Sequence, residues 1–226
     1  MSYIGTSKIG GMYLGATKIG KAYLGSDLVY SSVQEILPYD AQVEYLYSDG
    51  NAYIDTGINA DGGLSIECEF RQGATTNAAI AGAIYNRGSV QYYRHHLSPY
   101  SNAMYWYNSD KINGSSGISD TTNYHHIIVD ATNGTTTLDN TTTSFTVAVF
   151  DCQCNYHLFS RNSLNMNAQS KASYFKYFKM SRNGVLVRDF IPVRVGSVGY
   201  MYDKVSKQLF GNVGTGNFTF GNDKTT

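Results

Sequence analysis

Apolar and polar residues alternate with a period of two along much of the chain from about residue 41 onward. The clearest case is Leu64–Arg71, in which every even position is apolar and every odd position is polar. Successive side chains of a strand point to opposite faces, so this pattern predicts a strand with one face on a core and one in water. No stretch keeps the 3.6-residue period of an amphipathic helix. The pattern predicts an all-β fold.

Pairs of Asn and Gly mark turns between the predicted strands. A strand is expected over Tyr124–Ala131, followed by Asn133-Gly134, the preferred pair of a two-residue type I′ turn, and by a return strand over Thr135–Asp139. A second pair, Asn183-Gly184, separates two further strand-like segments. Many strands with short turns, and no helices to cover parallel crossovers, indicate an antiparallel β-sandwich or jelly roll.

The first thirty residues consist of a ten-residue repeat. MSYIGTSKIG, GMYLGATKIG and KAYLGSDLVY align so that Tyr, an aliphatic residue and Gly recur consecutively, with a second aliphatic residue further on. The recurring apolar residues are Tyr3, Ile4, Ile9, Tyr13, Leu14, Ile19, Tyr23, Leu24 and Val29. Each repeat offers two short extended stretches, and its glycine permits a sharp reversal between them.

Such short repeats cannot bury their apolar side chains alone. Ten residues carry about three of these side chains, and repeats of this kind form a core only by stacking on neighbours. We therefore expect the repeats to serve attachment or oligomerisation, on their own copies or on a host surface. A small β-meander on the flank of the following domain is the alternative, whereas tyrosine and isoleucine at fixed spacing are not typical of a flexible tail.

Three parts are predicted along the 226 residues. Residues 1–30 form the repeats and residues 31–40 a linker, because Pro38 disfavours helix before it and removes a ladder donor. Residues 41–226 form the sandwich, which is long enough to bury a full core. The three cysteines, Cys68, Cys152 and Cys154, are interpreted as small buried or surface thiols, since their spacing is poor for zinc.

Charge and hydropathy exclude several classes of partner. Seventeen basic and seventeen acidic residues give a net charge of zero, which disfavours nucleic acid as a partner. No apolar run approaches the roughly 20 residues needed to span a bilayer, so no membrane insertion is expected. The opening residues MSYIGT lack the basic and apolar regions of a secretory signal, so no signal peptide is expected.

Four segments together resemble one known family. VEYLYSDGNAYIDTGI, YHHIIVDATNGTTTLDN and FKMSRNGVLVRDFIPVR, followed by GYMYDKVSKQLFGNVGTGNFTFG, are similar to the opening strands, central hairpin and closing segment of concanavalin A-like, laminin G-type domains of phage and gut-bacterial proteins. This resemblance spans most of the chain after residue 41 and implies a jelly-roll sandwich.

The YLG decapeptides resemble, more loosely, segments at the start of phage particle proteins. That resemblance implies a virion structural protein: a head fibre, capsid decoration or tail-associated protein, assembled in the host cytoplasm. It further implies other virion proteins as partners through the repeats, a homo-oligomer such as a trimer, and cell-surface glycans as ligands. A glycan-binding module of a gut bacterium and a glycoside hydrolase are the alternatives.

No enzymatic activity is expected. Glycoside hydrolases need two carboxylates across the scissile bond, and the only close pair is Glu67 and Glu69 on one strand. Endoglucanases of this fold carry E-x-D-x-x-E, whereas the chain reads ECEFRQ here and lacks the middle Asp and the third acid. Solvated acids on the outer face of a strand explain the pair better.

Aromatic side chains are the usual contacts for sugar rings, and the richest source of them lies between residues 92 and 107. The candidate glycan-binding residues there are Tyr93, His95, Tyr105, Trp106 and Tyr107. Neighbours in a strand point to opposite faces, so Trp106 as a core residue would leave Tyr105 and Tyr107 exposed. The alternative interpretation of His95, His96, His125 and His126 is as polar residues on the sheet surface.

Two further features follow from the family resemblance. Many laminin G-type domains bind calcium at a rim, and Asp49, Asp55 and Asp61 could supply oxygen ligands, but none lies in a dense acidic loop, so no cofactor is expected. Arg188 and Asp189 match the closing strand of the family and are interpreted as an ion pair that ties down the last hairpin.

Overall fold

The computed structural model describes most of the chain, in two compact units, Met1–Leu37 and Pro38–Thr226. The described residues are 3–4, 7–8, 13–14, 17–24, 27–31, 37–73, 79–86, 92–98, 103–106, 111–113, 121–164 and 169–225. Within these ranges the secondary structure consists of strands, and no helix is long and apolar enough to cross a membrane.

Each decapeptide of the first unit forms one β-hairpin. The paired strands are β1 (Tyr3–Ile4) with β2 (Ser7–Lys8), β3 (Tyr13–Leu14) with β4 (Thr17–Lys18), and β5 (Lys21–Leu24) with β6 (Asp27–Ser31). The register is the same in all three hairpins, because each repeated tyrosine lies opposite the residue five positions further along the chain. These partners are Lys8, Lys18 and Leu28. The predicted pair of extended stretches per repeat is confirmed.

The second unit contains a larger sheet of eleven strands among the described residues. In spatial order its main path is β17 (Thr141–Ser144), β16 (Thr135–Leu138), β15 (His125–Asp130), β10 (Leu64–Gln72), β21 (Ser173–Arg182), β22 (Val185–Val195), β23 (Val198–Asp203) and β24 (Gln208–Phe210). Three short strands join its edges: β7 (Ala41–Gln42) on β22, and β8 (Leu46–Ser48) between β21 and β25 (Thr219–Phe220).

The smaller sheet has eight described strands. Its main path is β14 (Lys111–Asn113), β13 (Ala103–Trp106), β12 (Tyr92–Ser98), β11 (Ala81–Asn86), β18 (Asp151–Leu158) and β9 (Ile54–Asp61). Off this path, β19 (Ser160–Leu164) pairs with β11, and β20 (Gln169–Ser170) pairs with β19. All pairings are antiparallel except that of β11 with β19.

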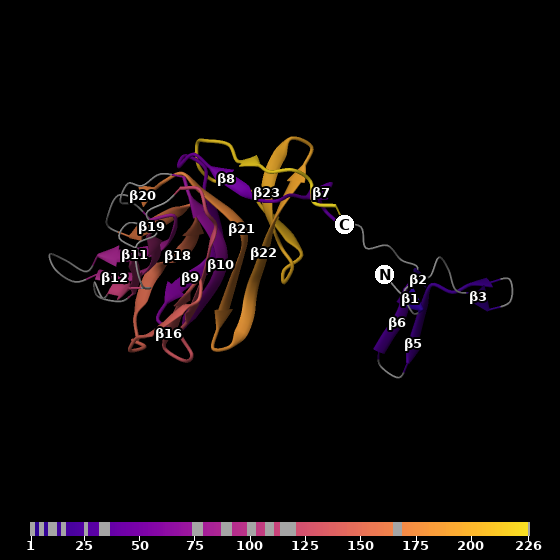
Figure 1. Ribbon diagram of the computed structural model, residues 1–226, viewed down its shortest axis with the longest axis horizontal. Coiled ribbons are helices and arrows are strands. Elements are labelled where there is room, and N and C mark those ends of the chain that lie inside the picture. Colours follow the sequence, from indigo (N-terminus) through magenta and orange to yellow (C-terminus); the bar gives the residue numbers. More distant parts are fainter. Residues whose placement is uncertain are drawn as a thin grey trace. The chain divides into compact units, whose positions relative to one another are not determined.

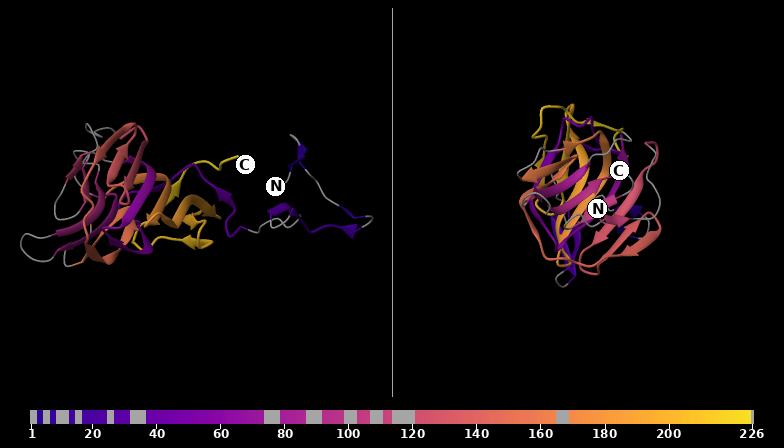
Figure 2. Two further views of the ribbon diagram at one scale, coloured as in Figure 1. Left: turned by 90° about the horizontal axis from the view of Figure 1, so that it is seen from below. Right: turned by 90° about the vertical axis from the view of Figure 1, so that its left-hand side faces the viewer.

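The two sheets pack face to face around one core. Figure 1 shows β10, β21 and β22 side by side in one layer and β9, β18 and β11 in the other, and Figure 2 gives the same layers from two further sides. Fully buried residues of both sheets, among them Phe70, Phe178 and Tyr156, form the contact between the layers. The predicted all-β, antiparallel sandwich is confirmed.

Strand β10 has the predicted two-faced pattern. Its even positions from Leu64 to Gln72 are buried and its odd positions are partly exposed. Each apolar side chain moved from water to the core contributes about 1.5–3 kcal/mol, so the inner face of this central strand fixes its register.

A β-bulge in β21 sets what the outer face of the larger sheet presents. Phe175 and Phe178 are three residues apart, which in a regular strand would place them on opposite faces. The register against β10 shifts here, since Glu69 is opposite Tyr177 and Phe70 is opposite Phe175, which leaves Lys176 as the extra residue. Both phenylalanines are therefore fully buried.

The two Asn-Gly pairs form different turns. Asn183 and Gly184 have φ angles of 51° and 77° and join Arg182 directly to its partner Val185, as in a type I′ turn. The type I′ turn predicted at Asn133-Gly134 is wrong, because the ladder closes at Asp130 and Thr135 and leaves a four-residue loop.

The carboxylate of Asp130 explains the longer loop. It accepts hydrogen bonds from the backbone N–H groups of Thr132 (2.9 Å) and Asn133 (3.1 Å) and from the Asn133 side chain (2.7 Å). This local cap offers the backbone an alternative to a tight turn. Gly134 alone takes the left-handed conformation there, with φ at 64°.

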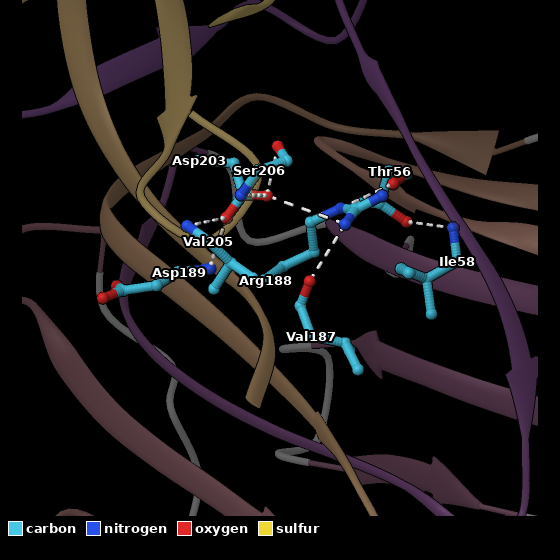
Figure 3. Close-up of polar contacts among 8 residues, drawn as sticks. All are labelled: Thr56, Ile58, Val187, Arg188, Asp189, Asp203, Val205 and Ser206. Carbon is cyan, nitrogen blue, oxygen red and sulfur yellow. Dashed lines mark hydrogen bonds and ion pairs between the residues drawn. The ribbon is translucent and has the colours of Figure 1, made fainter. Parts of the chain in front are cut away.

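The predicted ion pair between Arg188 and Asp189 is also wrong. Arg188 pairs with Asp203, the last residue of β23 (Figure 3), and Asp189 pairs with Lys204, the residue that follows it. The Arg188 Nη1 atom lies 3.6 Å from the buried Asp203 carboxylate, and Asp189 binds Lys204 at 2.6 Å. Arg188 also donates from Nε to the Thr56 carbonyl of β9, at 3.1 Å. Arg188 therefore links the two sheets at the end of the closing hairpin.

Candidate functional site

Four half-buried tyrosines gather on the outer face of the larger sheet, and we call them the tyrosine platform: Tyr45, Tyr47, Tyr124 and Tyr174. Tyr174 of β21 lies directly opposite Tyr47 of β8, with ring centroids 4.3 Å apart. The rings of Tyr45 and Tyr124 lie 5.3 Å and 6.5 Å from that of Tyr174. Leu46 is fully buried, which turns its two tyrosine neighbours outward.

Two cations lie over the platform. Arg71 of β10 is opposite Tyr174, and its guanidinium carbon is 3.8 Å from that ring centroid and 5.2 Å from that of Tyr124. The Lys176 ammonium lies 4.0 Å from the Tyr124 centroid and forms an ion pair with Glu69. Burial is the main reason that the pKa of the Tyr124 hydroxyl rises to about 12, so this group remains a neutral hydrogen-bond donor at physiological pH.

A groove of about 330 Å³ lies on the same sheet, toward the turns at the ends of its strands. Ser65, Glu67, Asp130, Lys179 and Leu186 are among the residues that line it. The platform and the groove both use odd-numbered residues of β10, so they belong to one face of the sheet.

Glu67 does not have the environment of a catalytic acid. Its carboxylate accepts hydrogen bonds from Lys179 (3.0 Å) and from the Tyr177 hydroxyl (3.0 Å), and His126 lies 3.6 Å away. Burial alone would raise the pKa of Glu67, but the hydrogen bonds from Lys179 and Tyr177 lower it on balance. A general acid needs a raised pKa, whereas Glu67 is held ionised.

The aromatic residues predicted from the sequence lie on the other sheet. His95 was expected at the surface but is fully buried, with Nε2 2.8 Å from the Leu64 carbonyl, which removes it from contact with a ligand. His96 is buried as well, at 2% exposure. Tyr93 is half-buried, and its ring stacks 5.9 Å from that of Phe150.

The other members of that group are only partly described. Tyr105 and Trp106 lie in β13 opposite His96 and His95, but their side chains lie outside the described residues, as does Tyr107 entirely. Their role as glycan contacts therefore stays a prediction.

The three aspartates considered for calcium each have local protein partners. Asp49 accepts from the Asn51 backbone at 2.9 Å, Asp55 from the Gly57 backbone at 2.8 Å, and Asp61 forms an ion pair with Arg182 at 2.9 Å. In the described part of the chain no three or more His, Cys, Asp or Glu residues group as metal ligands would.

The cysteines are free thiols, as interpreted from the sequence. Cys68 and Cys152 are buried, and Cys154 is partly buried. Burial raises the pKa of all three, which keeps the thiols protonated and unreactive.

The residues proposed for attachment occupy the three hairpins. Tyr3 and Ile4 form β1, Tyr13 and Leu14 form β3, Tyr23 and Leu24 end β5, and Val29 lies in β6. Their side chains lie outside the description, and so does Ile9 altogether. Ile19 is partly buried between β4 and β5. The attachment role stays a prediction.

The tyrosine platform is not predicted from the sequence, although the sequence contains patterns that point to part of it. Tyr45 and Tyr47 flank a buried leucine in the alternation typical of a strand. Tyr174 lies in SYFKYFKM, where the bulge at Lys176 hides the alternation.

Comparison with known proteins provides no further assignment. The chain matches no family model, and no curated protein or solved structure resembles it closely enough to count as a match.

Proposed function

We propose that this protein is a non-enzymatic structural component of a phage virion that binds glycans through the outer face of its β-sandwich. The tyrosine platform is the observation that carries the glycan-binding part. Sugars are bound by aromatic faces together with a few well-placed polar groups, and this face provides both next to one another. The family resemblance adds that the sandwich is a concanavalin A-like jelly roll.

The repeats support the assembly part of the proposal. Each is a separate two-stranded sheet, and an isolated hairpin is at best marginally stable in water. Docking on further copies, such as a trimer, or on a capsid or tail protein would bury their recurring tyrosine and aliphatic residues. Many displayed copies would then convert weak glycan contacts into firm adhesion.

Tyr174→Ala is expected to weaken glycan binding about tenfold, because loss of one aromatic contact of about 1.4 kcal/mol changes a dissociation constant by that factor. The measurement is a glycan array followed by titration of the best binder. Tyr85→Ala, in β11 of the smaller sheet, is the matched control and should bind like the wild type. Equal binding by both variants and the wild type would assign the site to another surface.

Purification of particles from the culture that produces the protein discriminates the virion role from that of a bacterial glycan-binding module. A virion component is recovered in constant stoichiometry with particles purified from the culture that produces it. A bacterial module stays with the cells or in the medium, and that distribution would contradict the virion assignment while leaving the glycan-binding face intact.

A further inference from the structure

Arg71 lies against two aromatic rings on the outer face. It lies in one row of directly opposed residues, Arg71, Tyr174 and Tyr47, that crosses strands β10, β21 and β8. Its guanidinium carbon is 3.8 Å from the Tyr174 ring centroid and 5.2 Å from that of Tyr124. Stacking of this kind fixes the plane of the guanidinium without using its N–H donors.

The charge of Arg71 has no counterion among the described residues. Other cations of the same face do: Lys176 pairs with Glu69, and Lys179 pairs with Glu67. Arg71 makes no such contact within the described part of the chain, and its Nε–H is enclosed there without a hydrogen-bond partner. Two acidic residues of the same region are engaged elsewhere: Glu69 is held by Lys176, and Asp49 by the backbone and side chain of Asn51.

Holding an unpaired charge on a half-buried side chain is costly, and an anionic ligand that reaches the terminal N–H groups of Arg71 recovers part of that cost. The planar guanidinium matches a carboxylate, which it binds with two parallel N–H···O hydrogen bonds. The adjacent rings of Tyr174 and Tyr47 provide an apolar surface on which a sugar ring can lie.

We infer that Arg71 and the tyrosine platform form a binding site for an acidic sugar, whose carboxylate pairs with the Arg71 guanidinium while its ring packs on Tyr174 and Tyr47. This inference rests on the proposed glycan-binding function and specifies its ligand class. It also assigns to Arg71 the discrimination between charged and neutral glycans.

The test compares acidic oligosaccharides with neutral versions of the same molecules. Oligogalacturonate and 3′-sialyllactose are titrated into the intact chain beside their carboxyl-reduced counterparts, and a sulfated galactose oligomer is the third probe. The wild type is expected to bind at least one carboxylate probe about tenfold or more tighter than its reduced form, in line with a charge-assisted hydrogen bond. Raising the salt concentration should narrow that difference.

Arg71→Gln is expected to abolish this preference while retaining the weaker binding of the reduced sugars. Arg71→Lys keeps the charge without the planar fork, so it should retain only part of the preference. Melting curves of both variants separate loss of binding from loss of fold. Arg182→Gln is the matched control, because Arg182 is already paired with Asp61, and it should keep the full preference.

The outcomes distinguish the two proposals. Equal binding of acidic and reduced probes, an unchanged preference in Arg71→Gln, or binding of the sulfated probe alone would overturn the assignment of Arg71 and leave glycan binding standing. Failure of every probe, together with an empty glycan array, would overturn the glycan-binding function itself.

Discussion

Replacement of Asp203 by alanine is expected to lower the free energy of unfolding by roughly 3–5 kcal/mol. Asp203 is fully buried, and its carboxylate accepts hydrogen bonds from the Asp189 N–H (2.8 Å), the Val205 N–H (3.1 Å) and both the N–H and the hydroxyl of Ser206 (3.1 and 2.7 Å). It also neutralises Arg188 (Figure 3). Its removal leaves these donors and one partly buried cation without their acceptor.

Chemical denaturation of the wild type and of Asp203→Ala measures this loss of stability. Asp203→Asn is a second variant to compare, because it keeps the shape of the side chain but loses its charge. Asp223→Ala is the matched control. Asp223 pairs with Arg194 through two hydrogen bonds, but the pair is exposed, so its loss should hardly move the midpoint. Equal midpoints for the two alanine variants would contradict a structural role of Asp203 in closing the sandwich.

The protein is expected to lose about 3 kcal/mol of stability between pH 6.5 and pH 4 through His95 alone. Burial lowers the pKa of His95 to about 4, from the usual 6.5. The unfolded chain therefore takes up a proton near pH 6.5 that the folded chain takes up only near pH 4. The stabilisation is fully present above pH 6.5 and is lost as the pH falls through this window.

Two other histidines act in the same direction. Burial lowers the pKa of His96 well below its usual range, and the nearby charges of Arg161 and Arg94 add to this effect. Burial also lowers the pKa of His157, although Asp55 partly opposes it. The total loss in acid should therefore exceed the share of His95.

Denaturation midpoints at several pH values between 7.5 and 4.5 test this expectation. His95→Gln keeps a donor for the Leu64 carbonyl but does not titrate, so its midpoint should fall less steeply than that of the wild type. His126→Gln is the control on the outer face, where the side chain is 39% exposed, and should follow the wild type closely. A wild-type midpoint that stays constant from pH 7.5 to 4.5 would contradict the buried, neutral state of His95.

The sandwich could be predicted because its strands have a recognisable pattern in the local sequence. The alternation from Leu64 to Arg71 requires only that one side be apolar, and the hairpin pairing of each decapeptide follows from residues close in sequence. The four-residue loop after Asp130 could not be derived in the same way. Its stability comes from a side-chain cap that competes with the Asn-Gly preference, and sequence alone does not rank the two.

The candidate site was less predictable because it is assembled from distant strands. Tyr47, Arg71, Tyr124 and Tyr174 become neighbours only once β8, β10, β15 and β21 are ordered in the sheet. The bulge at Lys176 depends on the need to bury two phenylalanines against the other layer, which is a tertiary requirement. The burial of His95 likewise follows from which face of β12 meets the core, and aromatic richness alone does not reveal that.

The repeats are proposed to assemble several copies of the chain, so that weak glycan-binding faces act together. A comparison of dissociation rates tests this most directly. The intact chain and a variant with Tyr3, Tyr13 and Tyr23 all changed to Ser are passed over a surface densely coated with the best-binding glycan. Their affinities for the same glycan free in solution should be equal. The intact chain should leave the surface about a hundredfold or more slowly than the variant, because several linked sites must release together. Equal dissociation rates for the two proteins would contradict the claim.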